Sequence, residues 1–389
     1  MLSRYKHQKW KIEVLNIKNI LYLGFVLLLT SCSGDDITAE NSLDGNGYDP
    51  VGTPILFSVG LQDKAITRTG PTSSPMAKGS RFVCTMYYHP HKNDNNSSLF
   101  VPTEEKIAKA WLEVSDDAGN AAYKNEAFSA AGTSFYWQNR LNHAFVAIAN
   151  NNDLTTTTSQ AIYKSPSDAA YNTYDLTKGE KTAITQQPDP IRAKEIKAPS
   201  DNTPANNSVT LNFQHQFSLV QVNLKNAAGN TTAITTDQIK KGELLGVSTE
   251  GYVYTMLNGE GSIDATRGND INLDEYTDEQ LATNKWGTSF VMFKMGEAAD
   301  GYLKSFNAIA FGHLRAIRIT WNDGSAHTAT FEITEAAQRD LASGKKYVYN
   351  LEISNTTPAA ARGQVVDRAL SEQVRLADVT ITNWPLNIE

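Results

Sequence analysis

The chain has 389 residues, of which 42 are acidic and 35 are basic, and its net charge is −7 at pH 7. This acidic balance argues against a nucleic-acid partner and against binding to an anionic membrane surface. Two cysteines are present, Cys32 and Cys84. If Cys32 carries a lipid, as argued below, Cys84 has no cysteine partner, which excludes a disulfide framework and a site of clustered thiolates.

The N-terminus has the composition of a secretion signal. Basic residues precede an apolar stretch from Ile20 to Leu29, and the small residues Thr30 and Ser31 lead into Cys32. The stretch is too short to span a bilayer stably as a helix, and the small residues end in a cysteine. Residues 1–31 are therefore predicted to be a lipoprotein signal peptide cleaved between Ser31 and Cys32. The alternative is an uncleaved signal anchor with an incidental cysteine.

Cys32 is the expected lipidation site of the mature chain. Acyl chains on its thiol and on the new amino terminus would bury many methylene groups, each contributing about 0.8 kcal/mol to membrane binding. Removal of residues 1–31 takes away five basic residues and one acidic residue, so the mature chain carries a net charge of −11. These features predict an exported protein held at a membrane by its lipid.

A flexible tether and then many short strands are expected after Cys32. Residues 32–53 are acidic, rich in Gly and Asn, and without periodicity, as is typical of a tether. The first alternating run then places Ile55, Phe57, Val59 and Leu61 on one face of a strand. Further strands are expected over residues 81–88, 109–114, 143–149, 209–224, 289–295, 314–321, 329–333 and 347–353. Short strands separated by turn-rich segments predict an all-β protein built from β-sandwiches.

Three local features refine this expectation. In residues 209–224 the inward positions change from odd to even numbers near Val220 and Gln221, which predicts a β-bulge there. The turn residues from Asn322 to Gly324 separate two apolar runs and predict a β-hairpin. Cys84 lies inside an alternating strand and is expected to be a small buried hydrophobe rather than a reactive thiol.

Two β domains are expected in the mature chain. Residues 150–207 are rich in Thr, Asn, Ser and Pro, which predicts long loops or an insertion rather than core. The boundary is therefore placed near residue 205, with an N-terminal sandwich over residues 54–205 and a C-terminal sandwich over residues 206–389. One short helix is expected between a Thr334 cap and Gly344.

The sequence offers no set of residues for catalysis, and we expect neither an enzyme nor a bound cofactor or metal. Residues 270–281 lack the glycine and the final carboxylate of an EF-hand loop, which favours a solvated acidic loop. His89 and His91 flank a proline without a third ligand nearby, which favours a surface turn. His215 lies on the apolar face of its strand and is expected to be a core histidine with a satisfied ring nitrogen.

Three segments resemble one protein family. The run from Val209 to Leu224, with Phe213 and His215 ahead of an apolar strand, resembles a segment of the fimbrillin-like proteins of Bacteroidales, which are subunits of the type V pilus. Residues 344–351 resemble the penultimate strand of that family, and residues 379–384 resemble its closing strand, which ends in Trp. The acidic pair after Cys32 also resembles the address that sends Bacteroidota lipoproteins to the outer face of the outer membrane.

The resemblance implies a fold, a location and an assembly mechanism. Family members resemble two tandem transthyretin-like β-sandwiches and reach the cell surface as outer-membrane lipoproteins, attached by their lipid. An arginine-specific protease then cuts after the first strand, and release of this strand exposes a groove that accepts a strand from the next subunit. The implied partners are therefore other fimbrillin subunits, this protease, and a ligand on a host or bacterial surface.

Candidate residues can be named for each step. Ile55, Phe57, Val59 and Leu61 would form the released strand. The cut would fall between Arg68 and Thr69, because Arg68 is the first arginine after Cys32 and has small neighbours; an ordinary loop arginine is the alternative. The candidate donor strand comprises Val379, Ile381, Trp384, Leu386 and Ile388. Five residues follow Trp384, which slightly favours the alternative that this segment is the last strand of its own sandwich, and leaves a tip or accessory subunit open.

A monomeric glycan-binding lipoprotein is the rival interpretation. Exposed aromatic rings could stack on sugars, and Tyr136, Trp137 and Trp286 are the candidates. Packing of these aromatics in the sandwich cores is favoured over that role.

Overall fold

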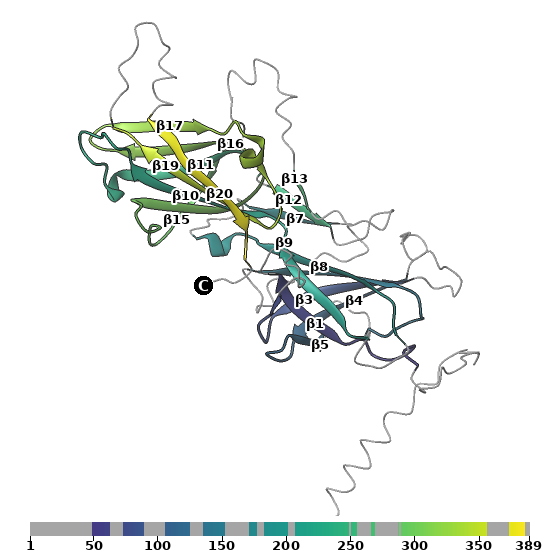
Figure 1. The fold of residues 1–389 in the computed structure, drawn as a ribbon. Coiled ribbons are helices and arrows are strands. Elements are labelled where there is room, and N and C mark those ends of the chain that lie inside the picture. Colours follow the sequence, from purple (N-terminus) through teal and green to yellow (C-terminus); the bar gives the residue numbers. More distant parts are fainter. Residues whose placement is uncertain are drawn as a thin grey trace, which may run out of the picture. The chain divides into compact units, whose positions relative to one another are not determined.

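The structure is a computed structural model that describes residues 49–62, 73–88, 106–124, 135–151, 171–176, 183–200, 207–248, 250–254, 266–268, 287, 289–355 and 373–385. Strands make up nearly all of the regular structure in these ranges, so the predicted all-β class is confirmed (Figure 1). Within them, no helix is both long and apolar enough to cross a membrane.

The first sheet closes on itself through strand β1. Its order is β2-β1-β5-β4-β3-β6-β8-β9, and an additional parallel pairing joins β1 to β9. The strands of this sheet are β1 (Phe57–Gln62), β2 (Ser73–Pro75), β3 (Arg81–Tyr88), β4 (Lys106–Val114), β5 (Asn120–Lys124), β6 (His143–Asn150), β8 (Pro190–Lys197) and β9 (Val209–His215). β1 therefore has hydrogen-bonded neighbours along both of its edges.

Alternating side chains of these strands fill the core of the first sheet. Phe57 of β1, Phe145 of β6 and Phe213 of β9 lie in one buried cluster. Cys84 belongs to the same cluster and is fully buried, which confirms its prediction as a small core residue. Burial also raises the pKa of its thiol far above the ordinary value, so the thiol stays protonated.

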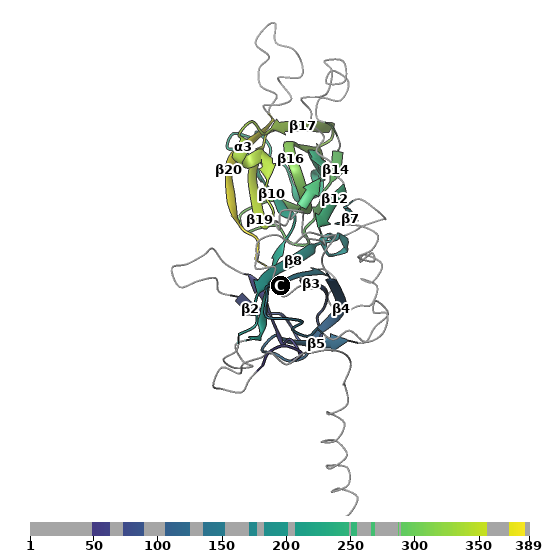
Figure 2. The ribbon, with the colours of Figure 1, turned by 90° about the vertical axis from the view of Figure 1, so that its right-hand side faces the viewer.

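The second sheet is organised by one long strand, β16 (Lys304–Asn322). Its first half pairs with β10 (Figure 2), and its second half pairs with β11 (Figure 1). The path through the sheet is β14-β11-β16-β10-β19-β20, with β15, β17 and β18 also paired to β16. The other strands are β10 (Ser218–Asn226), β11 (Ile239–Ser248), β14 (Ser289–Val291), β15 (Phe293–Lys294), β17 (Ala326–Glu332), β18 (Asp340–Leu341), β19 (Lys345–Ile353) and β20 (Val374–Asn383).

Gly312 occupies the point where β16 passes from one set of partners to the other. Its φ angle is +87°, and a Cβ atom there would lie 2.9 Å from Oγ of Ser248. We expect Gly312→Ala to destabilise the protein by about 2 kcal/mol, because left-handed backbone strain adds to this close contact. Chemical denaturation measures the effect, with Gly296→Ala as the control, since that site is open and has no left-handed φ. Equal stability of the two variants would contradict the expectation.

A small third sheet contains β7 (Tyr171–Asp175), β12 (Glu250–Tyr254) and β13 (Thr266–Gly268). Two 3-10 turns, η3 (Ile184–Gln186) and η5 (Thr236–Gln238), and one turn of helix, α3 (Ala336–Arg339), complete the described elements. Gln187, just after η3, is buried, and its side chain exchanges hydrogen bonds of 3.1 and 2.7 Å with the backbone of Ile309. It therefore pairs with β16 as a neighbouring strand would.

Two sequence predictions are confirmed in detail. β16 and β17 form the expected hairpin, in which Asn322 pairs with Ala326 across a turn that contains Gly324. His215 is a buried histidine with a satisfied ring, as described below.

Three other predictions are wrong. No bulge lies at Val220 or Gln221; residues 209–224 instead form two strands, and the chain leaves the first sheet at Gln216 and enters the second at Ser218. The change of inward side arises because each strand faces a different core. Residues 150–207 contain β8, whose Ile191 and Ala193 lie in the first core, so this segment is not only loop. The helix cap is Glu335, not Thr334, and the helix is one turn long.

Candidate functional site

Strand β1 is held by backbone hydrogen bonds on both sides. Val209 of β9 donates its amide to the carbonyl oxygen of Leu56 at 2.7 Å, and Val59 donates to Gly119 beside β5 at 2.7 Å. Just before β1, Ile55 donates to Phe135 at 2.8 Å, which ties the entry to the strand to residues 135–137. An extended segment can replace β1 only by forming hydrogen bonds along the same two edges.

The side chains of this segment alternate as the sequence predicts. Ile55, Phe57 and Val59 are 7%, 3% and 1% exposed, whereas Leu56 is 57% exposed. The Phe57 ring packs edge-on against Phe135 and Phe145, with centroids 5.5 and 5.8 Å apart. Leu61 lies within β1, but its side chain is outside the described part of the structure. The predicted first strand is thus a closing strand with large inward residues.

His143 begins β6 and is fully buried among Tyr88, Trp137 and Phe145. The backbone of Trp137 bonds to Gly52 and Thr53, shortly before β1. Its Nδ1 is 2.9 Å from the carbonyl oxygen of Leu141 and must donate, while Nε2 accepts the amide of Gln138 at 3.2 Å. These partners fix the neutral tautomer. Burial is the main cause that lowers the pKa of His143 to about 4, and the bond to Leu141 opposes this shift.

The C-terminal segment forms an edge strand of the second sheet. β20 pairs antiparallel with β19 from Val374 to Asn383, and Val379 packs partly buried against the second core. Arg375 and Asp378 bond across the sheet to Glu352 and Asn350. Ile381 is 40% exposed. The structure thus places residues 374–383 in their own sheet, while Leu386 and Ile388 lie outside the described residues.

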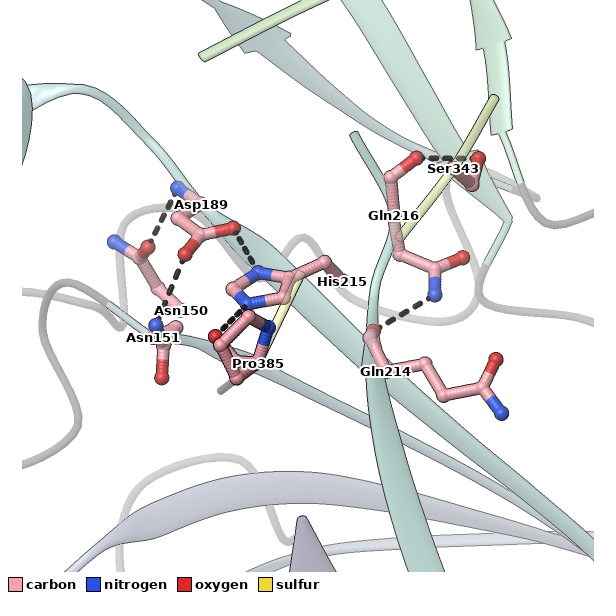
Figure 3. A network of polar contacts seen from close by, with 8 residues as sticks. All are labelled: Asn150, Asn151, Asp189, Gln214, His215, Gln216, Ser343 and Pro385. Carbon is pink, nitrogen blue, oxygen red and sulfur yellow. Dashed lines mark hydrogen bonds and ion pairs between the residues drawn. The ribbon is translucent and has the colours of Figure 1, made fainter. Parts of the chain in front are cut away.

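A buried polar network surrounds His215 at the end of β9 (Figure 3). Nδ1 of His215 lies 2.8 Å from Oδ1 of Asp189, and both side chains are 1% exposed. The other carboxylate oxygen of Asp189 accepts a hydrogen bond of 3.0 Å from Asn151, and its amide donates to Asn150 at 2.9 Å. Each carboxylate oxygen of this buried residue therefore has a polar partner, as a buried polar group requires.

The same histidine contacts the C-terminal segment. The ring of Trp384 stacks on it with a centroid separation of 3.6 Å and an interplanar angle of 2°. Nε2 of His215 lies 3.3 Å from the carbonyl oxygen of Pro385. The sequence predicts His215 as a core residue and Trp384 as part of the candidate donor strand, but not the contact between them. It does not single out Asp189. The signals available were a polar ring on an apolar face and a carboxylate between two prolines.

The remaining candidate residues are placed only in part. Trp137 is fully buried in the first core, whereas Tyr136 is 38% exposed. Of these two rings, that of Tyr136 is open to solvent. The other candidates lie outside the described residues: Ser31, Cys32, Arg68, Thr69, His89, His91, residues 270–281 and Trp286. Within the described ranges, no group of three or more His, Cys, Asp or Glu side chains could hold a metal ion.

Comparison with known proteins decides the family. A family model described as fimbrillin-like matches residues 85–384, which is most of the chain. The chain belongs to the fimbrillin-like family. No curated protein matches it in sequence.

Solved structures of low sequence identity are similar to this fimbrillin-like chain. A candidate cell adhesion protein from Bacteroides ovatus is 12% identical, with a TM-score of 0.50, and the match covers 87% of this chain and 99% of that one. A candidate cell adhesion protein from Bacteroides uniformis is 14% identical, with a TM-score of 0.47 and coverage of 85% and 99%. The truncated tip fimbrial protein Mfa3 from Porphyromonas gingivalis is 11% identical, with a TM-score of 0.38 and coverage of 85% and 99%.

Proposed function

We propose that this fimbrillin-like chain is a fimbrial subunit that reaches the cell surface as a lipoprotein and assembles by strand exchange at the position of β1. The observation that carries the proposal is the position of β1. It is the first described strand, it closes the first sheet, and it contributes large inward side chains to the core. Its loss would leave the edges of β5 and β9 open beside a row of apolar side chains, which is the receptor required for an incoming strand.

The proposed trigger is a cut between Arg68 and Thr69. Residues 63–72 join β1 to β2, so a cut there would separate β1 from the rest of the chain without breaking another described strand. Cys32 and its lipid would leave with the released segment. Residues 32–68 contain six acidic and two basic residues, so the net charge of the chain would change from −11 to −7.

Only part of the candidate donor strand remains available to a neighbouring subunit. Pairing of residues 374–383 with β19, and the ties of Arg375 and Asp378, favour a structural role for that part of the candidate donor strand. Because β20 is held in its own sheet, we propose a tip or accessory subunit that accepts a strand as the narrower form of this function, with adhesion as its role.

We expect Arg68→Ala to abolish processing. The unmodified protein, displayed on cells or treated with an arginine-specific protease, should acquire a new N-terminus at Thr69 and enter oligomers that survive on unheated gels. The variant should keep Cys32 as its N-terminus and run as a monomer. Arg339→Ala, at an exposed arginine of α3, is the matched control and should be processed normally. Cys32 at the N-terminus of assembled, unmodified subunits would overturn the proposed trigger.

A further inference from the structure

Strand β9 links two parts of the molecule that lie far apart in the sequence. Its residues from Val209 to Phe213 pair in parallel with β1. Its last two residues, Gln214 and His215, pair with β8. His215 therefore stands two positions beyond the last residue that β1 holds, on the same inward face as Phe213.

At this end of β9, the C-terminal segment is fastened by three contacts. Trp384 stacks on the His215 ring, Pro385 offers its carbonyl oxygen to Nε2, and the Trp384 amide donates to Gly344 at 2.8 Å. Gly344 in turn donates to Phe217 at 2.9 Å, just after β9. The position of Trp384 thus depends on how residues 215–217 are held.

The contacts of His215 make it the critical member. Its Nδ1 lies 2.8 Å from Oδ1 of Asp189, and its Nε2 lies 3.3 Å from the carbonyl oxygen of Pro385. The ring therefore connects β9 both to the buried Asp189 and to the C-terminal segment. If β9 shifts, the histidine moves away from Asp189 and from the Pro385 oxygen at the same time.

We propose that β9 is a relay that couples the pairing of β1 to the docking of Trp384 and Pro385 on His215. While β1 is in place, β9 is fixed along its length, and Trp384 and Pro385 stay docked on His215. We call this docking the latch. Removal of β1 takes the hydrogen-bonded neighbour from residues 209–213, so the end of β9 loosens and the latch opens. This coupling concerns the isolated chain and does not depend on cleavage at Arg68 or on polymer formation.

The relay predicts effects in both directions, because coupling between two sites is reciprocal. Residue-resolved hydrogen exchange on the mature chain can follow two amides: Trp384 reports the latch, and Val209, which bonds to Leu56, reports the pairing of β1. His215→Phe keeps a ring for stacking but removes both polar contacts. We expect it to raise exchange about ten-fold at Trp384 and several-fold at Val209.

One further variant and two controls complete the test. Val59→Asp puts a carboxylate at a position that is 1% exposed and should release β1, raising exchange at Trp384 by about ten-fold. Its control is Val291→Asp at a half-exposed site on edge strand β14, and the control for His215→Phe is His327→Phe in the hairpin; neither should change either amide.

Exchange at β3 amides shows whether Val59→Asp unfolds the whole first sheet, in which case His215→Phe alone decides. Faster exchange at Trp384 with no change at Val209 in His215→Phe would overturn the relay. Unchanged exchange at Trp384 in this variant would overturn the latch itself.

Discussion

Phe57→Ala is expected to lower the free energy of unfolding of the first sheet by about 3–5 kcal/mol. The ring is 3% exposed and packs edge-on against Phe135 and Phe145. Its removal loses the burial of an aromatic side chain and leaves a cavity on the inward face of β1. Urea denaturation followed by tryptophan fluorescence measures the loss, since Trp111 lies in β4 and the amide of Trp137 bonds to Thr53, shortly before β1.

The neighbouring residue supplies a matched control for this prediction. Leu56 precedes β1 and is 57% exposed, so Leu56→Ala should change the unfolding free energy by no more than about 0.5 kcal/mol. If both variants lost stability equally, β1 would not insert its odd-numbered side chains into the core. If Phe57→Ala were neutral, the strand would contribute little to the first sheet, and its replacement by another strand would have no energetic basis.

The stability of the protein should fall between about pH 6.5 and pH 4 because of His143. The pKa of its buried imidazole is lowered to about 4, against an ordinary value of 6.5 in the unfolded chain. Over this interval the unfolded chain binds the proton and the folded chain does not, so acid favours unfolding. The contribution is fully present above pH 6.5 and is lost as the pH falls to about 4, amounting to about 3 kcal/mol.

A non-titrating variant isolates this effect from the carboxylates that also titrate in acid. His143→Gln should be less stable than the unmodified protein at pH 7, and the difference should shrink by about 3 kcal/mol at pH 4. Unfolding curves at several pH values measure both proteins. A difference independent of pH would show that His143 is protonated equally in the folded and unfolded chains. Because the amide of Gln138 bonds to this ring, acid should loosen the entry to β1 as well.

Local sequence patterns located most of the individual strands. The apolar runs at residues 81–88 and 143–149 correspond closely to β3 and β6, and the turn at Gly324 specified the hairpin of β16 and β17. These signals are local, because alternation of side chains and the residues of a tight turn act over a few positions. The sequence did not predict β8 or β11, since the first lies in a segment rich in polar residues and prolines.

Local patterns also located the residues of the candidate site without showing their partners. Phe57 and His215 were placed on inward faces, and both are buried. A single reading of residues 209–224 could not show that this run is divided between two sheets, because inward residues look alike whichever core they face. Asp189 has no local pattern that would connect it with His215.

The sequence by itself determined the all-β class, the inward face of the first strand, and the buried state of Cys84 and His215, because each depends on the character and spacing of nearby residues. Only the tertiary structure decided that β1 pairs in parallel with β9 and closes the first sheet, and that Trp384 rests on the His215 ring beside Asp189. The physical reason is that strand pairing and buried charge contacts join segments far apart in the chain. Their energy depends on register and geometry, which no local pattern of residues specifies.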